Sequence, residues 1–340
     1  MWPSFPSNIL GLALLPLVLA SPVQKRARGP WMALDTDFPD PSFVGDPNGG
    51  WYAFGTNGNG KTIQVASSPD FQKWTLLNKE ALPTLGGWET NVNHWAPDVI
   101  RRVCFPWRSF RETKLTRQND GKYVMYYSGE AKSDPGHHCV GAAISQGTDP
   151  SGPYIPQPNP FACDLDNGGA IDPSGFLDKD GTRYVVYKVD GNSIGNGGDC
   201  NNSVAPIKPT PIMLQKVEED GVTPVGSPVQ ILDRDDSDGP LVEAPNLILH
   251  QGIYFLFYST HCYTDPKYDV RYATATSVAG PYTKTNTELF KTGQFGMTSP
   301  GGGTVSGAGD RLLLHSFCQP NVRCTYAANI SIQGKTVTVL

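Results

Sequence analysis

The chain has 340 residues, with 27 Lys and Arg against 32 Asp and Glu, so its formal net charge is -5. Charged residues make up 17%, aromatic residues 10%, and glycine (37) and proline (30) are abundant. No stripe of Lys and Arg stands out, which excludes a nucleic-acid partner because phosphates need a basic face. The composition favours a turn-rich β protein with a neutral, hydroxyl-rich ligand.

Residues 1–20 predict a secretory signal peptide. They contain an apolar run that ends in small residues and is shorter than the roughly 20 residues of a membrane span. Residues 21–26 follow as a short propeptide if Lys25-Arg26 is a dibasic processing site; the alternative is an exposed basic pair. We therefore expect a secreted, extracellular monomer with no membrane partner, whose mature chain covers residues 27–340.

Strand-like runs fill the mature chain, and clusters of Gly, Pro, Asn and Asp separate them. No segment keeps a helical apolar period for long enough to compete. The expected strands lie at residues 51–55, 63–66, 123–127, 140–144, 184–188, 212–215, 253–258, 270–274 and 312–315.

Residues 103–118 have a composition that belongs to neither flanking strand. Without them, Arg102 would join Asn119-Asp120-Gly121 in a short hairpin turn with an Asp-Gly signal. Codons for its Val-Cys, Leu-Thr and Gln can form intron donor, branch-point and acceptor sequences. We therefore expect a retained intron; the alternative is a genuine loop insertion in a surface hairpin.

The chain has seven cysteines, an odd number for a secreted protein, and Cys104 lies in the suspected insertion. The other six can form disulfides in an oxidising compartment, and their number allows many pairings. One pair is predicted: Cys318 with Cys324, because their short separation suits a hairpin or loop clip. No zinc-type spacing appears.

A weak internal repeat connects the strands. Residues 129–154 and 259–282 both pass from an aromatic strand to a second strand and then to Gly-Pro-Tyr. A four-stranded sheet repeated radially is a propeller blade, and at about 60 residues per blade the mature chain holds five. We predict an all-β, five-bladed β-propeller in a single domain; the alternative is a pair of β-sandwiches.

Three acidic motifs, each before a strand, supply the candidate catalytic residues. Asp40 lies in Phe-Pro-Asp-Pro-Ser, Asp172 in Ala-Ile-Asp-Pro, and Glu243 in Val-Glu-Ala-Pro. Each alone is an ordinary strand boundary, since proline favours an extended residue before it. Together they offer what a glycosidase needs: a proton donor, a base for water, and a third carboxylate that sets the donor's pKa.

These motifs and repeats resemble those of glycoside hydrolase family 43, and the resemblance covers essentially the whole mature chain. It implies a single catalytic propeller domain that inverts the anomeric configuration. Asp40 would be the general base, Asp172 the pKa modulator and Glu243 the general acid. Asp37 competes with Asp40, but the Asp-Pro-Ser sequence matches at Asp40.

The same resemblance assigns further residues. The run from His94 to Asp98 is similar to the family's Trp-Ala-Pro-Asp motif, which implies that Trp95 and His94 bind substrate and that Asp98 is structural; the alternative for Trp95 is core packing. His315 resembles a histidine that holds a calcium or a water cluster on the propeller axis; the alternative is a satisfied core residue. No cofactor is required, and a structural calcium is the metal to test.

The resemblance implies a substrate among the arabinose- or xylose-containing polysaccharides and oligosaccharides of plant cell walls. We favour an α-L-arabinofuranosidase or an endo-1,5-α-L-arabinanase, because no β-sandwich of the kind found in many β-xylosidases follows the fifth blade. The alternatives are a β-xylosidase and a non-catalytic carbohydrate-binding propeller, which would not need three acids. A related retaining family of fructosidases has different acidic motifs.

Overall fold

The computed structural model describes residue 1 and residues 29–102, 120–285 and 287–340. The signal peptide beyond its first residue, the propeptide and residues 103–118 lie outside these ranges, so each stays a prediction. The helical elements within these ranges are short 3-10 turns: η1 (Leu165–Asn167), η2 (Gly191–Ile194), η3 (Asp199–Asn201), η4 (Asp236–Asp238) and η5 (Gln294–Gly296). None of the described helices has both the length and the apolar character that a membrane crossing requires.

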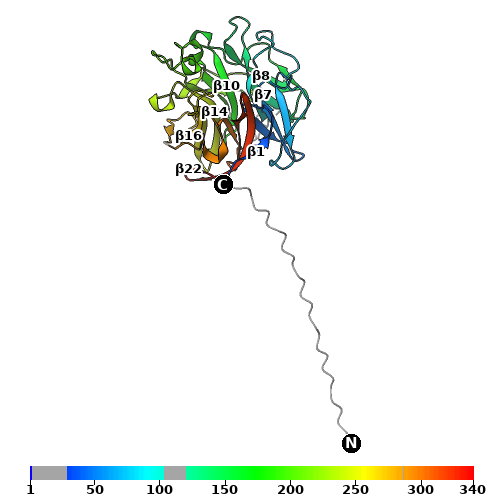
Figure 1. The fold of residues 1–340 in the computed structure, drawn as a ribbon. Helices are drawn as coiled ribbons and strands as arrows, with labels where there is room; N and C mark the ends of the chain where they lie inside the picture. Colours follow the sequence, from blue (N-terminus) through cyan, green and yellow to red (C-terminus); the bar gives the residue numbers. More distant parts are fainter. Residues whose placement is uncertain (2–28, 103–119, 286) are drawn as a thin grey trace.

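Five antiparallel sheets form the molecule, and each is one blade of a β-propeller (Figure 1). Blade I contains β2 (Ser42–Gly45), β3 (Trp51–Gly55), β4 (Gln64–Ser68) and β5 (Thr75–Leu76). Blade II contains β6 (Trp95–Arg101), β7 (Tyr123–Glu130), β8 (His138–Ser145) and β9 (Tyr154–Pro156). Blade III contains β10 (Ala170–Leu177), β11 (Arg183–Val189), β12 (Ile212–Val217) and β13 (Val229–Leu232).

The last two blades have five strands each. Blade IV contains β14 (Val242–His250), β15 (Ile253–Thr260), β16 (Asp269–Ala275), β17 (Thr283–Lys284) and β18 (Phe290–Lys291). Blade V contains β19 (Gly301–Val305), β20 (Arg311–Gln319), β21 (Val322–Gln333), β22 (Thr336–Val339) and the N-terminal β1 (Trp31–Leu34). The five-bladed propeller is confirmed, and the alternative pair of β-sandwiches is excluded.

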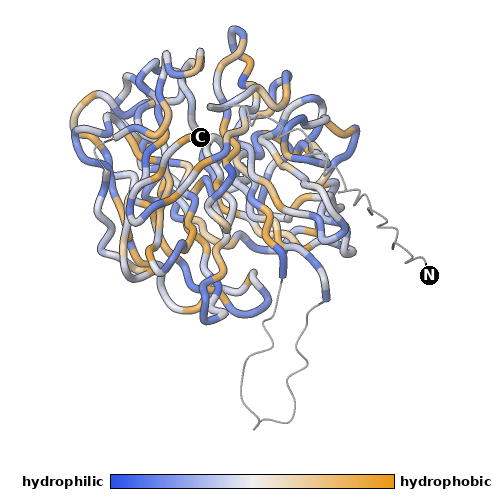
Figure 2. Tube along the Cα trace, turned by 90° about the horizontal axis from the view of Figure 1, so that it is seen from below, coloured by the Kyte–Doolittle hydropathy of each residue, from blue (hydrophilic) through white to orange (hydrophobic). Residues whose placement is uncertain are grey.

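The predicted strands are also confirmed, since each expected run lies in or overlaps a strand of the structure. Hydrophobic stretches alternate with hydrophilic ones along the chain (Figure 2). The apolar side chains pack between neighbouring sheets: Phe176 and Leu214 of blade III share a cluster with Leu247 and Leu256 of blade IV. The core is therefore divided among the blade interfaces, and the axis is left for other side chains.

The strand β1 closes the ring by pairing with β21, so that the two ends of the chain share blade V. Ala33 and Leu34 of β1 are buried in a cluster with Leu313 of blade V and Phe43 of blade I. This interface holds the first blade against the last one.

A repeated backbone feature shapes the axis. The innermost strands of blades II to V each shift register at a bulge. The bulge residues have positive φ: Ala96 (43°), Asp172 (55°), Ala244 (51°) and Gly302 (58°), and Asp40 (54°) has the same conformation just before β2. Four of these five precede proline, where extended backbone was expected. This conformation costs about 1–3 kcal/mol for a non-glycine residue, and bulges re-aim side chains.

Three disulfides join the six described cysteines: Cys139–Cys163, Cys200–Cys262 and Cys318–Cys324. The predicted Cys318–Cys324 pair is confirmed, and it clips the β20–β21 hairpin. On either side of residues 103–118, the strands pair as far as Arg101 with Tyr123. Nη1 of Arg102 also lies 3.2 Å from Oδ2 of Asp120, so the flanks meet as a hairpin requires.

Replacing Leu313 by alanine should lower the free energy of unfolding by about 2–5 kcal/mol, because the side chain is fully buried where the last blade meets the first. Denaturant titration of both proteins measures the difference. The matched control is Val229→Ala, at a side chain that is 49% exposed, where a change within about 0.5 kcal/mol is expected. Equal losses at the two sites would show that the closing interface contributes no special stability.

Candidate active site

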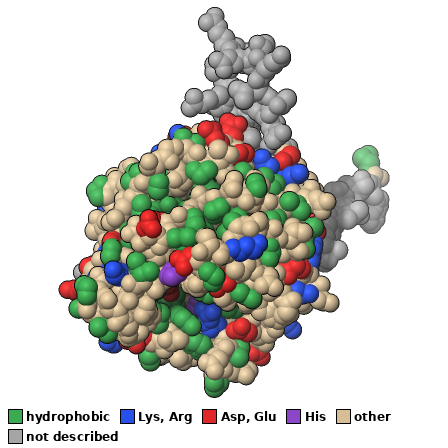
Figure 3. Space-filling view, turned by 90° about the horizontal axis from the view of Figure 1, so that it is seen from above, with side chains coloured by type: hydrophobic (Ala, Val, Ile, Leu, Met, Phe, Trp, Pro, Cys, Tyr) green, Lys and Arg blue, Asp and Glu red, His purple; other side chains and the backbone are tan. Residues whose placement is uncertain are grey.

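The four bulge residues and Asp40, the equivalent residue of blade I, line one pocket on the axis. Two of them, Asp40 and Asp172, bring carboxyl groups to it. The lining consists of Asp40, Ser42, Ala96, Pro97, Asp98, Asp172, Pro173, Ser174, Ala244, Pro245, Gly302, Gly303 and Thr304. Figure 3 shows a hollowed face of the molecule with acidic, basic and histidine side chains beside the hollow.

Asp40 has contacts on both oxygens of its carboxyl group. The Thr56 hydroxyl donates to Oδ2 at 2.6 Å, and Nη1 of Arg323 lies 3.4 Å from Oδ1. Its backbone N–H donates to Nδ1 of His315 at 3.0 Å. Burial alone would raise the pKa of Asp40, but the Arg323 charge and the neighbouring His315 and Thr56 side chains hold it well below its usual value. Asp40 is therefore ionised, as a general base must be.

Asp172 connects blade III to its neighbours on both sides. Its backbone N–H donates to the Ser128 hydroxyl, and its Oδ2 accepts from the Ala244 N–H, each at 3.0 Å. Burial and then the charge of Glu243 raise the pKa of Asp172 to about 8, although Lys188 opposes this. Carboxyl groups that interact in this way titrate as a pair. Below that pH, the pair holds a proton that acid catalysis can use.

Glu243 immediately precedes the bulge of blade IV, and its carboxyl group accepts from two buried donors. The Tyr268 hydroxyl lies 2.8 Å from Oε1, and Nζ of Lys188 lies 3.2 Å from Oε2. Burial raises the pKa of Tyr268 well above its usual value, so its hydroxyl keeps its proton. Lys188 also lies 3.1 Å from Oδ1 of Asp190. Burial opposes its charge, but Asp190, Glu243 and Asp172 raise the pKa of Lys188 above its usual value.

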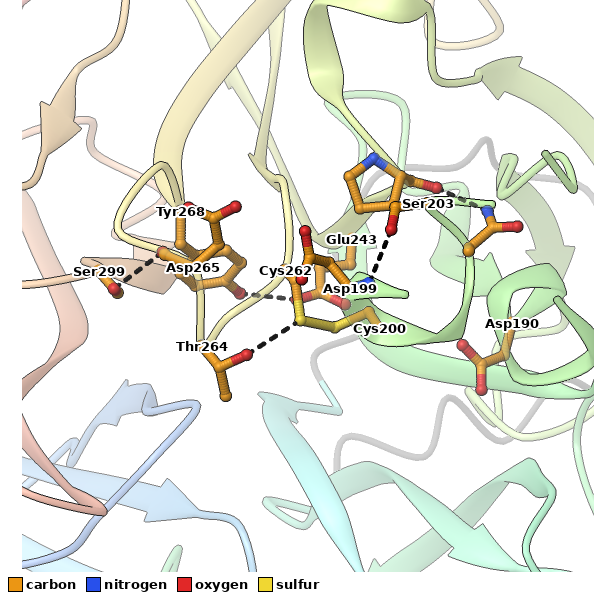
Figure 4. Close-up of a disulfide and its surroundings, with 12 residues drawn as sticks. Asp190, Asp199, Cys200, Ser203, Glu243, Cys262, Thr264, Asp265, Tyr268 and Ser299 are labelled. Carbon is orange, nitrogen blue, oxygen red and sulfur yellow. Dashed lines mark hydrogen bonds between the residues drawn. A yellow bond between two sulfur atoms is a disulfide. The ribbon is translucent and has the colours of Figure 1, made fainter. Parts of the chain in front are cut away.

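The loop that carries Tyr268 is held in place from two sides (Figure 4). Cys262, at its start, forms a disulfide with Cys200 in η3, so this loop of blade IV is joined to a loop of blade III. On the other side, the Ser299 hydroxyl donates to the Asp265 carbonyl at 2.9 Å. These bonds fix the position of the Tyr268 hydroxyl. Gly301 also has to be glycine, because a Cβ there would clash with the Tyr268 ring.

Trp95 is partly exposed and stacks on His138, with ring centroids 3.7 Å apart and an interplanar angle of 26°. Burial lowers the pKa of His138 to about 4, so the supporting ring is neutral. A tryptophan held on one face in this way is a suitable platform for a sugar ring, and its role in substrate binding stays a prediction.

His94 is buried and is not among the residues that line the pocket, and its expected role in substrate binding stays a prediction. Its ring is 1% exposed, and Nε2 lies 3.2 Å from Oε2 of the buried Glu89. Glu89 also accepts from the Tyr127 hydroxyl at 2.8 Å. His94 therefore belongs to a buried polar cluster behind Trp95, where an unpaired imidazole would be costly.

Two other acids are placed as structural partners. The backbone N–H of Gly175 donates to Oδ2 of Asp98 at 2.7 Å and links blade III to blade II. Burial raises the pKa of Asp98 to about 6. Asp37, the competitor of Asp40, accepts from the Arg323 N–H at 2.9 Å and is not among the residues that line the pocket.

His315 is fully buried beside Asp40, and burial lowers its pKa. Its Nε2 has no hydrogen-bond partner among the described residues. Among these residues, the one cluster with metal-ligand spacing is Asp35 with Cys318 and Cys324, and its two cysteines form a disulfide. Calcium prefers six to eight oxygen ligands. The residues therefore fit a water cluster, or an ion that keeps most of its water, held by one nitrogen of His315.

Sequence reasoning missed three charged or hydroxyl side chains of the site. Lys188 was inside a predicted strand, and a lysine at the end of Tyr-Val-Val-Tyr could have been recognised as unusual for a buried strand. Arg323 was next to a predicted disulfide cysteine. Tyr268 lies in a loop with no local signal, since only the fold brings it to Glu243.

Three carboxyl groups, gathered on the axis of a five-bladed propeller and held by buried donors, define a site of the glycosidase type. The chain matches the family model described as Glycosyl hydrolases family 43 over residues 33–333. It belongs to this family, and it is an enzyme that hydrolyses glycosidic bonds.

Individual relatives agree with this assignment. The chain is 27% identical over 293 residues to the extracellular endo-alpha-(1->5)-L-arabinanase 1 of Bacillus subtilis (82% of this chain, 75% of that enzyme). It is 28% identical over 249 residues to a β-D-galactofuranosidase of Aspergillus niger (70% of this chain, 60% of that enzyme). A solved thermostable family-43 glycoside hydrolase has a TM-score of 0.71 at 24% identity (89% and 93% covered), and the native Bacillus subtilis arabinanase has 0.65 at 22% (90% and 98% covered). The two structures share the fold.

The raised pKa of Asp172 predicts a pH-dependent stability cost. The unfolded chain releases this proton near the ordinary pKa of 3.8, whereas the folded protein keeps it until about 8, so stability falls as pH rises between these values. Asp172→Asn removes the titration and keeps an oxygen for the Ala244 N–H. The difference in free energy of unfolding between the variant and the wild type should therefore change in favour of the variant by about 1–3 kcal/mol from about pH 4 to about pH 8.

Denaturant titrations at both pH values measure this gain. The control is Asp236→Asn, at a fully exposed side chain, where no pH-dependent gain is expected. A gain for Asp172→Asn that is the same at both pH values would contradict the raised pKa.

Proposed function

We propose that the protein is a secreted, inverting hydrolase of arabinose-containing plant cell-wall polysaccharide, with endo-1,5-α-L-arabinanase as the first candidate activity and α-L-arabinofuranosidase as the second. The observation that supports the reaction class is the placement of three carboxyl groups near one axis: Asp40 beside Arg323, and Asp172 bonded to the Ala244 N–H next to Glu243. Similarity to an enzyme named as an extracellular arabinanase, over 82% of this chain, supports the choice of substrate.

The reaction follows from the protonation of these groups. Asp40 accepts a proton from a water molecule while the water oxygen bonds to the anomeric carbon. Glu243 gives its proton to the glycosidic oxygen as the bond between that oxygen and the anomeric carbon breaks. Water attacks opposite the leaving group, so the configuration inverts. A cation or water cluster at His315 would contribute to the charge balance beside Asp40, and the proton transfers above do not pass through it.

Secretion is supported by the three disulfides, which form and persist in oxidising compartments, and by the apolar N-terminal run. N-terminal sequencing of protein from a culture medium tests the proposed start near Ala27. A β-xylosidase and a β-D-galactofuranosidase remain alternative activities, the latter because of the relative from Aspergillus niger.

A solution of linear arabinan should lose most of its viscosity while few reducing ends have appeared, because an endo enzyme cuts within the chain. NMR of the first products should show the inverted anomer before mutarotation. Nitrophenyl arabinofuranoside, xyloside and galactofuranoside complete the panel. Asp40→Asn is the control, and it should lose nearly all activity because no base activates the water.

Reducing ends without early loss of viscosity would identify exo action and favour the arabinofuranosidase. Faster cleavage of the xyloside or galactofuranoside than of any arabinose substrate would overturn the proposed substrate. A retained anomer would mean a covalent intermediate and make Asp40 a nucleophile.

Glu243→Gln should slow the hydrolysis of arabinan by about 10²–10⁴-fold, since the leaving sugar oxygen needs the proton that the amide cannot give. Nitrophenyl arabinofuranoside should lose less, because nitrophenolate leaves without protonation. Initial rates on both substrates measure the two losses. Losses of equal size would contradict the assignment of Glu243 as the acid.

A further inference from the structure

The five blades have equivalent residues around the axis, and blade III departs from the hydrogen-bond pattern that the other four share. In each blade, the residue before the bulge position pairs with one residue of the second strand: Pro39 with Thr56, Trp95 with Ser128, Ile171 with Lys188, Glu243 with Ser259, and Gly301 with His315. These second-strand residues occupy one equivalent position.

Four of these second-strand residues have the same role as hydrogen-bond acceptors. Each accepts a hydrogen bond from the backbone N–H of the bulge residue in the next blade. The bonds run from Ala96 to Thr56 (2.9 Å), Asp172 to Ser128 (3.0 Å), Gly302 to Ser259 (3.1 Å) and Asp40 to His315 (3.0 Å). This ring of bonds fixes one bulge to the next.

Lys188 is the exception, because an ammonium group donates and cannot accept. The N–H of Ala244, which would bond to this position, donates to Oδ2 of Asp172 instead. The released Nζ of Lys188 reaches Glu243 at 3.2 Å and Asp190 at 3.1 Å. One departure from the repeat therefore links Asp172 to the backbone next to Glu243 and places a cation on Glu243.

Burial makes this cation unusual. Lys188 is fully buried, where a lysine is rarely found unless it is paired. The charged groups that face it are Asp190, Glu243 and Asp172. Glu243 itself also faces the Tyr268 hydroxyl and the more distant His315. A cation is needed to pair with Asp190, but this pairing alone does not explain why Lys188 also contacts Glu243.

We propose that Lys188 is a positioning residue for proton transfer: with Tyr268, it orients the Glu243 carboxyl group and stabilises the carboxylate that remains after the proton has passed to the leaving oxygen. The proposal rests on the proposed role of Glu243 as the acid. The negative charge of Asp172 and the positive charge of Lys188 then have opposite electrostatic effects on the Glu243 carboxyl group.

The test is Lys188→Met, assayed across pH on arabinan and on nitrophenyl arabinofuranoside. On arabinan, kcat should fall by about 10–100-fold with little change in KM, and the aryl substrate should lose less. Without the cation, the carboxylate left after proton transfer loses a stabilising charge, so the alkaline limb of the kcat profile should move to higher pH by about 1 unit or more. Asp172→Asn should move that limb to lower pH.

Two further variants keep the test decisive. Lys188→Arg retains the charge and should leave the alkaline limb in place. If Lys188→Met does not fold, Lys188→Met with Asp190→Asn removes one cation and one anion together, and the same shift is expected. Lys216→Met, at an exposed lysine on β12 of the same blade, is the matched control and should match the wild type.

The outcomes separate the two proposals. If Glu243→Gln slows both substrates equally, the acid assignment fails. If Glu243→Gln separates the substrates but the folded lysine variant slows both equally with an unchanged pH profile, the role of Lys188 is overturned while the function stands.

Discussion

The site depends on a backbone conformation that the fold repeats five times. At each bulge, a residue with positive φ turns the innermost strand toward the axis, and in four blades this residue precedes proline. The cost of this conformation is offset by the packing between blades and by the ring of hydrogen bonds from each bulge to its neighbour. Because the scaffold is repeated, a carboxyl group at a bulge position points to the axis whichever blade carries it.

The blades differ in chemistry at these equivalent positions. The Arg323 charge beside Asp40 holds its pKa well below the usual value, whereas burial and the Glu243 charge raise the pKa of Asp172, so that Asp172 and Glu243 share one proton as a pair. The same backbone geometry therefore gives carboxyl groups with opposite pKa shifts, and the charges placed beside each residue decide the direction. Lys188 and Tyr268 hold the Glu243 carboxyl group, and both donors are buried, where hydrogen bonds are stronger than in water.

Local sequence was sufficient for the architecture, and it selected three acids that the fold brings close together. Strand patterns such as 253–258 and the Gly-Pro-Tyr repeat predicted the propeller, and the Asp-Pro and Glu-Ala-Pro motifs marked the bulges. The conformation at those motifs was not foreseen, since proline favours an extended neighbour and only the sheet forces the other choice. Contacts between distant residues, such as Tyr268 with Glu243, have no local signal. The burial of His94 against Glu89 was not foreseen either, because no motif connects the two residues.

The disulfides have a consequence for how the enzyme is made. Each one includes a cysteine next to, or on the same loop as, a residue of the site: Cys139 follows His138, Cys262 begins the loop of Tyr268, and Cys324 follows Arg323. The apolar clusters between blades III and IV and between blades I and II contain none of these cysteines, so their packing does not depend directly on the bonds. In a reducing cytosol the blades would therefore pack without the bonds that hold the loops of the site. The yield of soluble protein would then report on blade packing, and the turnover rate on disulfide formation.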